Sequence, residues 1–461
     1  MLTYQFDREN HLPVYEQLYR FIRDDILSGK IPGDTRLPSK REFASHLGIS
    51  KVTVENAYAL LISEGYVYSL AKKGYFAEKD LSVPGVKYTG NLLSDNSEDK
   101  YSIDLCSNMV PPHQFPFSVW TRLMKKICLD YSDELLTPIP YNGTLYLRSV
   151  LCRYLFENKG MDVRPSQIVI GAGSEILYSN IIRALGDDVS LGIEYPTYHK
   201  TINIYRQNLD DITFLPLNDE GIIMEYLNNS GCNVIHFSPS HNFPTGTITS
   251  ARRRAEILKW ANEKDNRFII EDDFDSELRF SGKPMLPVYS SDAGGKVIYI
   301  NTFSKTIAPS VRIGYMVLPV SLAERYGKMF SGNSCTVSSF EQYTLADFIN
   351  DGYFERHLNR TRKYYRELRS VLLSKAAEFG MFSITENDAG LHFVLGFDTD
   401  KDDAYISSEL RKKGINSMFM SDYGAGEKNN HKLLINYSGL NVASFETFLS
   451  ELDYILQNGE D

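Results

Sequence analysis

The sequence predicts two domains of different class: a small helical domain with a β-hairpin, then a larger α/β domain with a mainly parallel sheet. Three observations predict this. The chain has 461 residues, more than one hydrophobic core usually supports. Residues 13–63 show apolar side chains at helical spacing, interrupted by glycines. From Ile103 onward, apolar runs alternate with helical stretches, as strands alternate with crossover helices.

Composition narrows the class of protein further. With 43% hydrophobic and 12% aromatic residues the chain can bury substantial cores. No apolar run reaches the roughly 18 to 20 residues of a membrane helix, and the start "MLTYQFDREN" lacks the layout of a secretory signal. We therefore expect a cytoplasmic protein without membrane contact. Five scattered cysteines without a CxxC pair predict buried, reduced thiols and no metal site.

Charge is distributed unevenly along the chain. The net charge is −10, but residues 1–80 hold 11 basic and 11 acidic side chains, so the whole acidic excess lies beyond them. Residues 26–53 carry five basic and two acidic side chains. This modest basic patch is compatible with nucleic-acid binding.

The first domain is predicted to contain three helices. Apolar residues at helical spacing predict the first helix over residues 13–28, ended by Gly29. Ser39 can cap a second helix, "KREFASHL", with Glu42 as a capping-box partner, and Gly48 ends it. Ser50 caps the third helix. Its apolar face consists of Val54, Ala57, Tyr58 and Leu61.

Two helices joined by a tight glycine-containing turn form the geometry that enters a major groove, with the first turn of the second helix facing outward. The stretch "GYVYSLAKKGYFA" then alternates as in a β-hairpin around Lys72–Lys73–Gly74, which suits a wing that touches phosphates. The alternative is a three-helix packing module without a DNA role.

The stretch "GDTRLPSKREFASHLGISKVTVENAYALLISEGYV" resembles the winged helix-turn-helix domain of GntR-type bacterial transcription factors, and the resemblance covers residues 10–78. It implies binding to a double-stranded DNA operator. Lys51 stands where the family commonly has arginine; a lysine holds phosphate well but reads guanine less well. The DNA contacts implied by the resemblance are Arg36, Ser39, Arg41, Lys51, Thr53 and Gly74.

These observations divide the chain into a DNA-binding domain at 1–78, a linker and an α/β domain. Residues 79–101 are polar, contain proline and glycine and show no sustained period, so we interpret them as the linker. The α/β domain spans 102–461, with a large part at about 140–330 and a smaller part at about 331–461.

Four stretches of the α/β domain place polar residues directly after a predicted buried strand. In open α/β sheets, ligands bind at the carboxyl ends of strands, so these stretches are expected to share a site. Gly173 and Ser174 open a helix after strand 168–170 and suit a phosphate, although such turns are often only tight turns. Tyr198 suits stacking on a flat ligand. The third stretch is "SPSHNFPTG"; the fourth is "EDDFD", in which strand alternation puts Asp272 and Phe274 on one side.

The stretch "NTFSKTIAPSVRIGY" adds a lysine among groups that can hold phosphate. Thr302 and Ser304 precede Lys305, and Arg312, with its planar fork of donors, follows. Pyridoxal 5′-phosphate (PLP) needs an amine, a carboxylate for its pyridine nitrogen, a phosphate cup and an aromatic shelf. A lone lysine would be an ordinary surface residue, but the whole set in this order predicts a PLP site.

From about residue 103 to the end the chain resembles fold-type I aminotransferases, through "SKTIAPSVRIGY", "PTG" and "EDD". Together with the GntR-like start, this resembles the MocR subfamily of bacterial regulators. The resemblance implies that Lys305 holds PLP as an aldimine, that Asp272 pairs with the pyridine nitrogen and that Tyr198 stacks on the ring. The phosphate ligands that it implies are Gly173, Ser174, Thr302, Ser304 and Arg312.

Two positions depart from the family pattern. Phe274 replaces a tyrosine whose hydroxyl supports the phenolic oxygen of the cofactor. Leu434, in "LLINYSG", replaces the arginine that grips a substrate α-carboxylate, which removes a contact of about 1.5 to 3 kcal/mol. The second departure argues against efficient transamination of α-amino acids.

The leading hypothesis is a homodimeric transcription regulator that senses PLP itself, or an amine or amino acid that reacts with PLP, through Lys305. The resemblance implies the dimer; the sequence does not define an interface. The alternatives are an aminotransferase with an accessory DNA-binding domain and a scaffold without cofactor.

Overall fold

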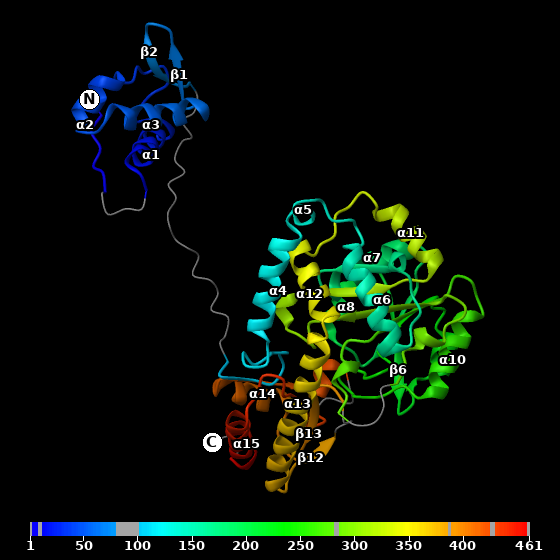
Figure 1. The fold of residues 1–461 in the computed structure, drawn as a ribbon. Helices are drawn as coiled ribbons and strands as arrows, with labels where there is room; N and C mark the ends of the chain where they lie inside the picture. The colour runs from blue at the N-terminus through cyan, green and yellow to red at the C-terminus, as the bar shows by residue number, and fades with distance from the viewer. Residues whose placement is uncertain are drawn as a thin grey trace. The chain divides into compact units, whose positions relative to one another are not determined.

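The computed structural model describes residues 2–7, 12–79, 101–280, 285–385, 389–424 and 429–458. The chain divides into two compact units, residues 1–98 and 99–461 (Figure 1). The predicted linker, 79–101, lies outside the described residues except for Lys79 and Tyr101.

The first unit has the predicted three helices and hairpin. These are α1 (Val14–Leu27), α2 (Lys40–Leu47), α3 (Lys51–Ser63), β1 (Val67–Leu70) and β2 (Gly74–Ala77). The hydroxyls of Ser39 and Ser50 accept hydrogen bonds from the backbone N–H groups of Glu42 and Thr53, which starts α2 and α3 where the sequence predicts. Gly48 ends α2 in the left-handed conformation. The predicted apolar face of α3 is fully buried in the core of this unit.

The second unit is built on an eight-stranded sheet in the order β4-β11-β10-β9-β8-β5-β6-β7. The pairs β5–β6, β5–β8, β8–β9 and β9–β10 are parallel, and β7 and β11 run against their neighbours. The sheet is therefore mainly parallel, as predicted. Its strands are β4 (Ile168–Gly171), β5 (Leu191–Tyr195), β6 (Ile212–Asn218), β7 (Gly221–Ile222), β8 (Val234–Phe237), β9 (Phe268–Asp272), β10 (Val297–Thr302) and β11 (Gly314–Val317).

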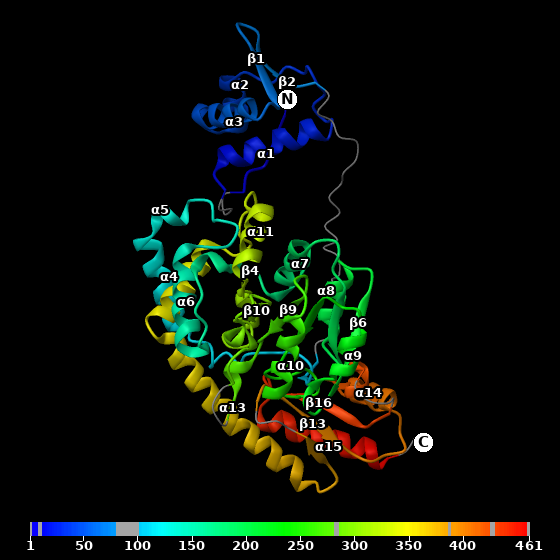
Figure 2. The same cartoon turned by 90° about the vertical axis from the view of Figure 1, so that its right-hand side faces the viewer.

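Helices cover both faces of this sheet (Figure 2). On one face, α7 (Ser174–Leu185), α8 (His199–Arg206) and α11 (Val320–Phe330) pack on Ile270 and Ile300. On the other, α6 (Leu145–Lys159) and α12 (Ser339–Asn350) pack on Ile168 and Tyr299, and α10 (Ala251–Asn262) packs on Ile269. The unit also contains α4 (Phe117–Asp130), α5 (Ser132–Leu135) and α9 (Met224–Asn229).

A smaller antiparallel sheet, in the order β12-β13-β16-β15, forms the C-terminal part of this unit. Its strands are β12 (Ser383–Thr385), β13 (His392–Gly396), β15 (Met418–Phe419) and β16 (Lys432–Asn436), and its helices are α14 (Asp403–Lys412) and α15 (Val442–Gln457). The long α13 (Tyr353–Glu378) contacts both α12 and α15 and so joins the two parts (Figure 2). The short β3 (Ile103–Asp104) pairs in parallel with β14 (Ile415–Asn416), so the first strand of this unit packs beside its C-terminal part.

The cysteines are free thiols, as predicted, but their burial was predicted wrongly. Only Cys232 is buried and Cys128 is exposed, because Cys128 falls on an outward-facing position of α4. No helix among the described residues is long and apolar enough to cross a membrane.

Candidate functional site

The four stretches predicted to share a site lie at one edge of the large sheet, because their strands end there. Asp272, the last residue of β9, is in register with Ile300 of β10. Thr302, the last residue of β10, is in register with Gly314 of β11, which is in register with Gly171 at the end of β4. The parallel strands β5 and β8 end at the same edge. Residues far apart in the sequence thus converge at this edge.

Lys305 follows β10 and is partly buried. Burial lowers the pKa of its amine below the ordinary lysine value, and the negative charge of Asp275 only partly opposes this effect. A lysine with a lowered pKa has a larger neutral fraction near pH 7, and only the neutral amine is a nucleophile.

Gly173 and Arg312 form a close contact at the start of α7. A Cβ atom on Gly173 would lie 2.8 Å from Nη2 of Arg312, and the φ angle of Gly173 is +88°, so the turn requires glycine. Arg312 has a left-handed backbone, with φ of 52°, and Nη2 donates to the carbonyl of Ala172 at 3.3 Å. The first N–H groups of α7, beginning at Ser174, and this guanidinium can together bind an anion. Glu175 lies 3.3 Å from the guanidinium and competes for it.

Asp272 is buried and only partly satisfied. Tyr178 on α7 donates its hydroxyl to Oδ2 at 2.6 Å, and Nε2 of His236 on β8 lies 3.6 Å from the same oxygen. The other oxygen, Oδ1, is buried without a hydrogen-bond partner among the described residues. A buried carboxylate oxygen without a partner is costly, so this atom suits a ligand that brings a donor.

The remaining predicted cofactor residues lie near this edge. Thr302 is buried at the end of β10, and Ser304 is partly buried. Tyr198 precedes α8, is 47% exposed and contacts the ring of Phe243 edge-on at 5.6 Å. The strand β9 ends at Asp272, so the strand alternation predicted to place Phe274 beside Asp272 does not extend that far.

Leu434 lies in β16 in an apolar environment. It is 1% exposed and packs in a cluster with Val394, Met420 and Tyr423, against which Phe243 also packs. Leu434, which the resemblance places at the position of the family arginine, is therefore a packed core side chain.

Sequence reasoning missed a pair of histidines beside Lys305. Nδ1 of His241 lies 2.8 Å from Oδ2 of Asp275, and the rings of His241 and His392 are 4.8 Å apart. Burial, with the charges of His241 and Lys305, holds the pKa of His392 well below the usual value, so His392 is neutral. His241 falls within "SPSHNFPTG" and could have been found there, whereas His392 enters from β13 and has no local signal.

The predicted DNA-binding residues lie at the surface of the first unit. Arg36, Ser39, Arg41 and Lys51 are exposed, and Thr53 is partly exposed. A Cβ atom on Gly74 would lie 3.2 Å from Nε of Arg36, so Arg36 rests on the hairpin. Within the described part of the first unit, no hydrogen bond or ion pair joins Arg41 to the other predicted DNA-binding residues.

Glu55 on α3 contacts two lysines, one at the start of α2 and one at the start of α3, and sequence reasoning missed both contacts. Its Oε1 atom lies 3.3 Å from Nζ of Lys51 and 3.8 Å from Nζ of Lys40. The ammonium group of Lys40 also lies over the ring of Tyr75 in the hairpin, at 5.2 Å. A carboxylate thus contacts both Lys51, which the sequence predicts to bind DNA, and Lys40, which was not among the predicted DNA contacts.

Comparison with known proteins defines the class first. Residues 14–76 match the family of bacterial regulatory proteins of the gntR type, and residues 101–451 match aminotransferase class I and II. The fold and the comparisons therefore define a transcription regulator with a winged helix-turn-helix domain and an aminotransferase-like domain. The chain belongs to the MocR-like subfamily of GntR regulators.

Relatives span nearly the whole chain. An uncharacterised HTH-type transcriptional regulator of Bacillus subtilis, YdeL, is 35% identical and covers 90% of each chain. The pyridoxine biosynthesis transcriptional regulator PdxR of Corynebacterium glutamicum is 27% identical, covering 95% of this chain and 94% of PdxR. Among solved structures, a Pyrococcus horikoshii kynurenine aminotransferase matches with a TM-score of 0.68 and 25% identity, over 78% of this chain and 92% of the enzyme.

Proposed function

We propose that this regulator holds PLP covalently on Lys305 and that occupancy of this site changes how the DNA-binding unit engages its operator. The observation that carries the proposal is the partly buried lysine with a lowered pKa at the sheet edge where Gly173, Arg312 and Asp272 also lie. Members of the aminotransferase fold family use PLP, and this edge offers each group that PLP needs.

The residues fit the cofactor in three respects. Oδ1 of Asp272 is free to accept a hydrogen bond from a protonated pyridine nitrogen. Gly173, Ser174 and Arg312, with Thr302 and Ser304, would hold the phosphate. Tyr198, half exposed at the site, would cover the ring. When bound, PLP supplies an aldehyde that condenses with a primary amine.

The signal that we propose is PLP itself or a small amine or amino acid that competes with Lys305. Leu434 favours PLP itself or an amine without a carboxylate, because the apolar cluster around it offers no partner to an anion. The name of the relative PdxR, a regulator of pyridoxine biosynthesis, supports PLP as the signal.

We further propose that the protein acts as a homodimer in which two DNA-binding units meet two half-sites. Arg36, Arg41 and Lys51 would hold phosphates, Ser39 and Thr53 would fix the helix ends, and Gly74 would let the hairpin approach DNA. A ligand shifts such an equilibrium only by its difference in affinity for the two states.

Titration of PLP against a duplex DNA fragment that contains the operator tests the proposal. We expect the DNA affinity or the DNA bend to change with PLP in the wild type but not in Lys305→Ala. Unchanged DNA binding with Lys305 fully modified would refute the sensor. The fold similarity to aminotransferases favours an enzyme as second candidate; repeated turnover of an amino donor would support the enzyme, and a lack of turnover would support the regulator alone.

A further inference from the structure

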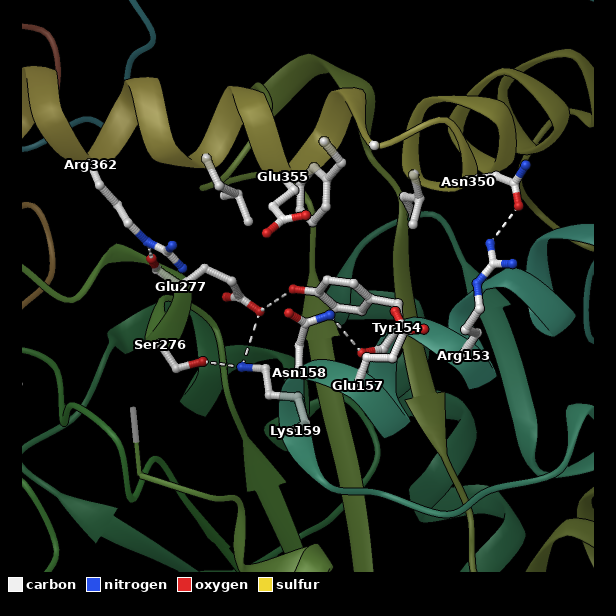
Figure 3. Close-up of a pocket in the computed structure, with 14 residues that line it drawn as sticks. Arg153, Tyr154, Glu157, Asn158, Lys159, Ser276, Glu277, Asn350, Glu355 and Arg362 are labelled. Atoms are coloured by element: carbon white, nitrogen blue, oxygen red, sulfur yellow. Dashed lines mark hydrogen bonds and ion pairs between the residues drawn. The ribbon is translucent and has the colours of Figure 1, made fainter. Parts of the chain in front are cut away.

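A cavity separate from the Lys305 site lies in the aminotransferase-like unit, on the face of the large sheet opposite to Asp272. Successive strand residues point to opposite faces, so Asp272 faces α7, whereas Asp273 reaches Lys159 at the end of α6. The cavity has a volume of about 480 Å³, within the range of small-molecule sites. It lies between the end of α6, the first half of α13 and the turn at residues 276–278 (Figure 3).

The floor of the cavity is a buried charge network. Nζ of Lys159 lies 2.9 Å from Oδ2 of Asp273 and 3.1 Å from Oε1 of Glu277. Burial would lower the pKa of Lys159, but the two carboxylates outweigh it and raise this pKa well above the usual value. Of the two carboxylates that face this ammonium, only Glu277 also lines the cavity.

One atom of this network points to a ligand. Glu277 is only 5% exposed, and its Oε2 atom is buried without a hydrogen-bond partner among the described residues. The Oε1 atom, by contrast, is close to Lys159 and accepts from Asn301 at 3.1 Å. Glu277 lines the cavity, and a buried carboxylate oxygen without a partner favours a cationic donor.

A guanidinium lies next to this carboxylate. Nε of Arg362 on α13 donates to the backbone carbonyl of Glu277 at 2.5 Å, and Nη1 donates to Asn359 at 3.3 Å. In the described part of the chain Arg362 has no ion pair with a carboxylate. Figure 3 shows Arg362 extending from α13 toward Glu277, so a guanidinium and a carboxylate both line this end of the cavity.

The remaining lining favours a ligand without net charge. Arg153, Lys159 and Arg362 balance Glu157, Glu277 and Glu355, so an anion or a cation alone would meet as much repulsion as attraction. The two arginines lie at opposite ends of the cavity (Figure 3). An adjacent carboxylate and guanidinium match the adjacent ammonium and carboxylate groups of an amino acid.

We infer that this cavity binds a free α-amino acid, with its ammonium group on Glu277 and its carboxylate on Arg362, separately from the Lys305 site. The ligand needs no cofactor here, so the inference goes beyond the proposed function. Asp273, which binds Lys159 at the floor of the cavity, directly follows Asp272 in the chain. Asp272 is the residue proposed to hold the pyridine nitrogen, so the cavity and the Lys305 site are joined through neighbouring residues.

The test uses the full-length Lys305→Ala protein freed of PLP, so that no imine with the probe can form. Calorimetric titration with each of the standard L-amino acids at millimolar concentration is expected to find saturable binding by at least one. Arg362→Gln should weaken that binding by about tenfold or more, because a charge-assisted contact is lost. Arg366→Gln, an exposed arginine one turn further along α13, is the matched control and should leave it unchanged.

Two further probes keep the result decisive. Two analogues of the bound amino acid, one without the amino group and one without the carboxylate, should each bind much more weakly to the protein. The amino acid itself should bind much more weakly to Glu277→Gln. Absence of binding by every amino acid, equal binding by the analogue without the amino group, or binding unaffected by Arg362→Gln would overturn the inference. None of these outcomes bears on PLP attachment, which is measured separately in the wild type.

Discussion

Removal of the Glu55 carboxylate is expected to strengthen DNA binding, because this group holds two lysines, Lys40 at the start of α2 and Lys51 at the start of α3. Glu55→Gln keeps the shape of the side chain and frees Lys51 and Lys40, now 3.3 Å and 3.8 Å from the carboxylate. Each freed lysine that meets a phosphate steepens the slope of log Kobs against log salt by about 0.9. We therefore expect a slope steeper by about one to two.

The expected gain in affinity follows from the same contacts. Both ion pairs are partly exposed, with side-chain exposures of 29% for Lys40, 49% for Lys51 and 35% for Glu55, so each is weak. Loss of the i,i+4 pair between Lys51 and Glu55 costs roughly 0.3 to 0.5 kcal/mol of helix stability. The DNA affinity at low salt should rise by about three- to tenfold, because the substitution removes a repulsion of about 1 kcal/mol between the Glu55 carboxylate and a nearby phosphate.

Fluorescence anisotropy with a mixed-sequence duplex at several salt concentrations measures both quantities, since the electrostatic component does not depend on sequence. Glu16→Gln is the matched control, because Glu16 on α1 also forms an i,i+4 pair, with Arg20 at 2.9 Å. An equal change in both variants, or an unchanged salt slope in Glu55→Gln, would show that the start of α3 does not meet phosphates.

Three further predictions concern single residues. Asp275→Asn should move the pH midpoint of the rate of PLP attachment to lower pH, because Asp275 raises the pKa of Lys305 against the effect of burial; stopped-flow absorbance measures this, and a midpoint moved upward would contradict it. Leu434→Ala should lower the free energy of unfolding by roughly 2 to 5 kcal/mol in urea denaturation, because Leu434 is 1% exposed; a loss of a few tenths would show that its cluster is loosely packed. Ser50→Ala should destabilise the first unit by about 1 kcal/mol through loss of the bond to Thr53 N–H at 3.0 Å, measured by thermal denaturation, whereas an unchanged melting temperature would mean that the cap contributes nothing.

Local signals in the sequence predicted most of the fold. In the first unit, α2 and α3 begin directly after Ser39 and Ser50, because their hydroxyls accept hydrogen bonds from nearby backbone N–H groups, and this chemistry is readable from a few residues. Strand β4, the turn at Gly173 and the start of α7 were likewise predicted from the residues that form them. Strand ends were less accurate: β9 ends at Asp272, and the backbone leaves the sheet before Phe274.

What the sequence could not provide were contacts between distant residues. The contact of Glu55 with Lys40 depends on how α3 packs on α2, and that of Tyr178 with Asp272 depends on how α7 packs on the sheet. His392 reaches the site from a different sheet, so its neighbourhood to His241 follows only from the tertiary fold. The cavity above Glu277 needs α6 and α13 side by side, and no spacing in the sequence encodes that approach.

Covalent attachment of PLP to Lys305 is the central claim, and it can be measured directly. The full-length protein is incubated with PLP, reduced with borohydride, digested and analysed by mass spectrometry. The account predicts a pyridoxyl group on the peptide that contains Lys305, and none on that peptide in Lys305→Ala. A modification confined to other lysines, or no modification of the wild-type protein, would contradict it.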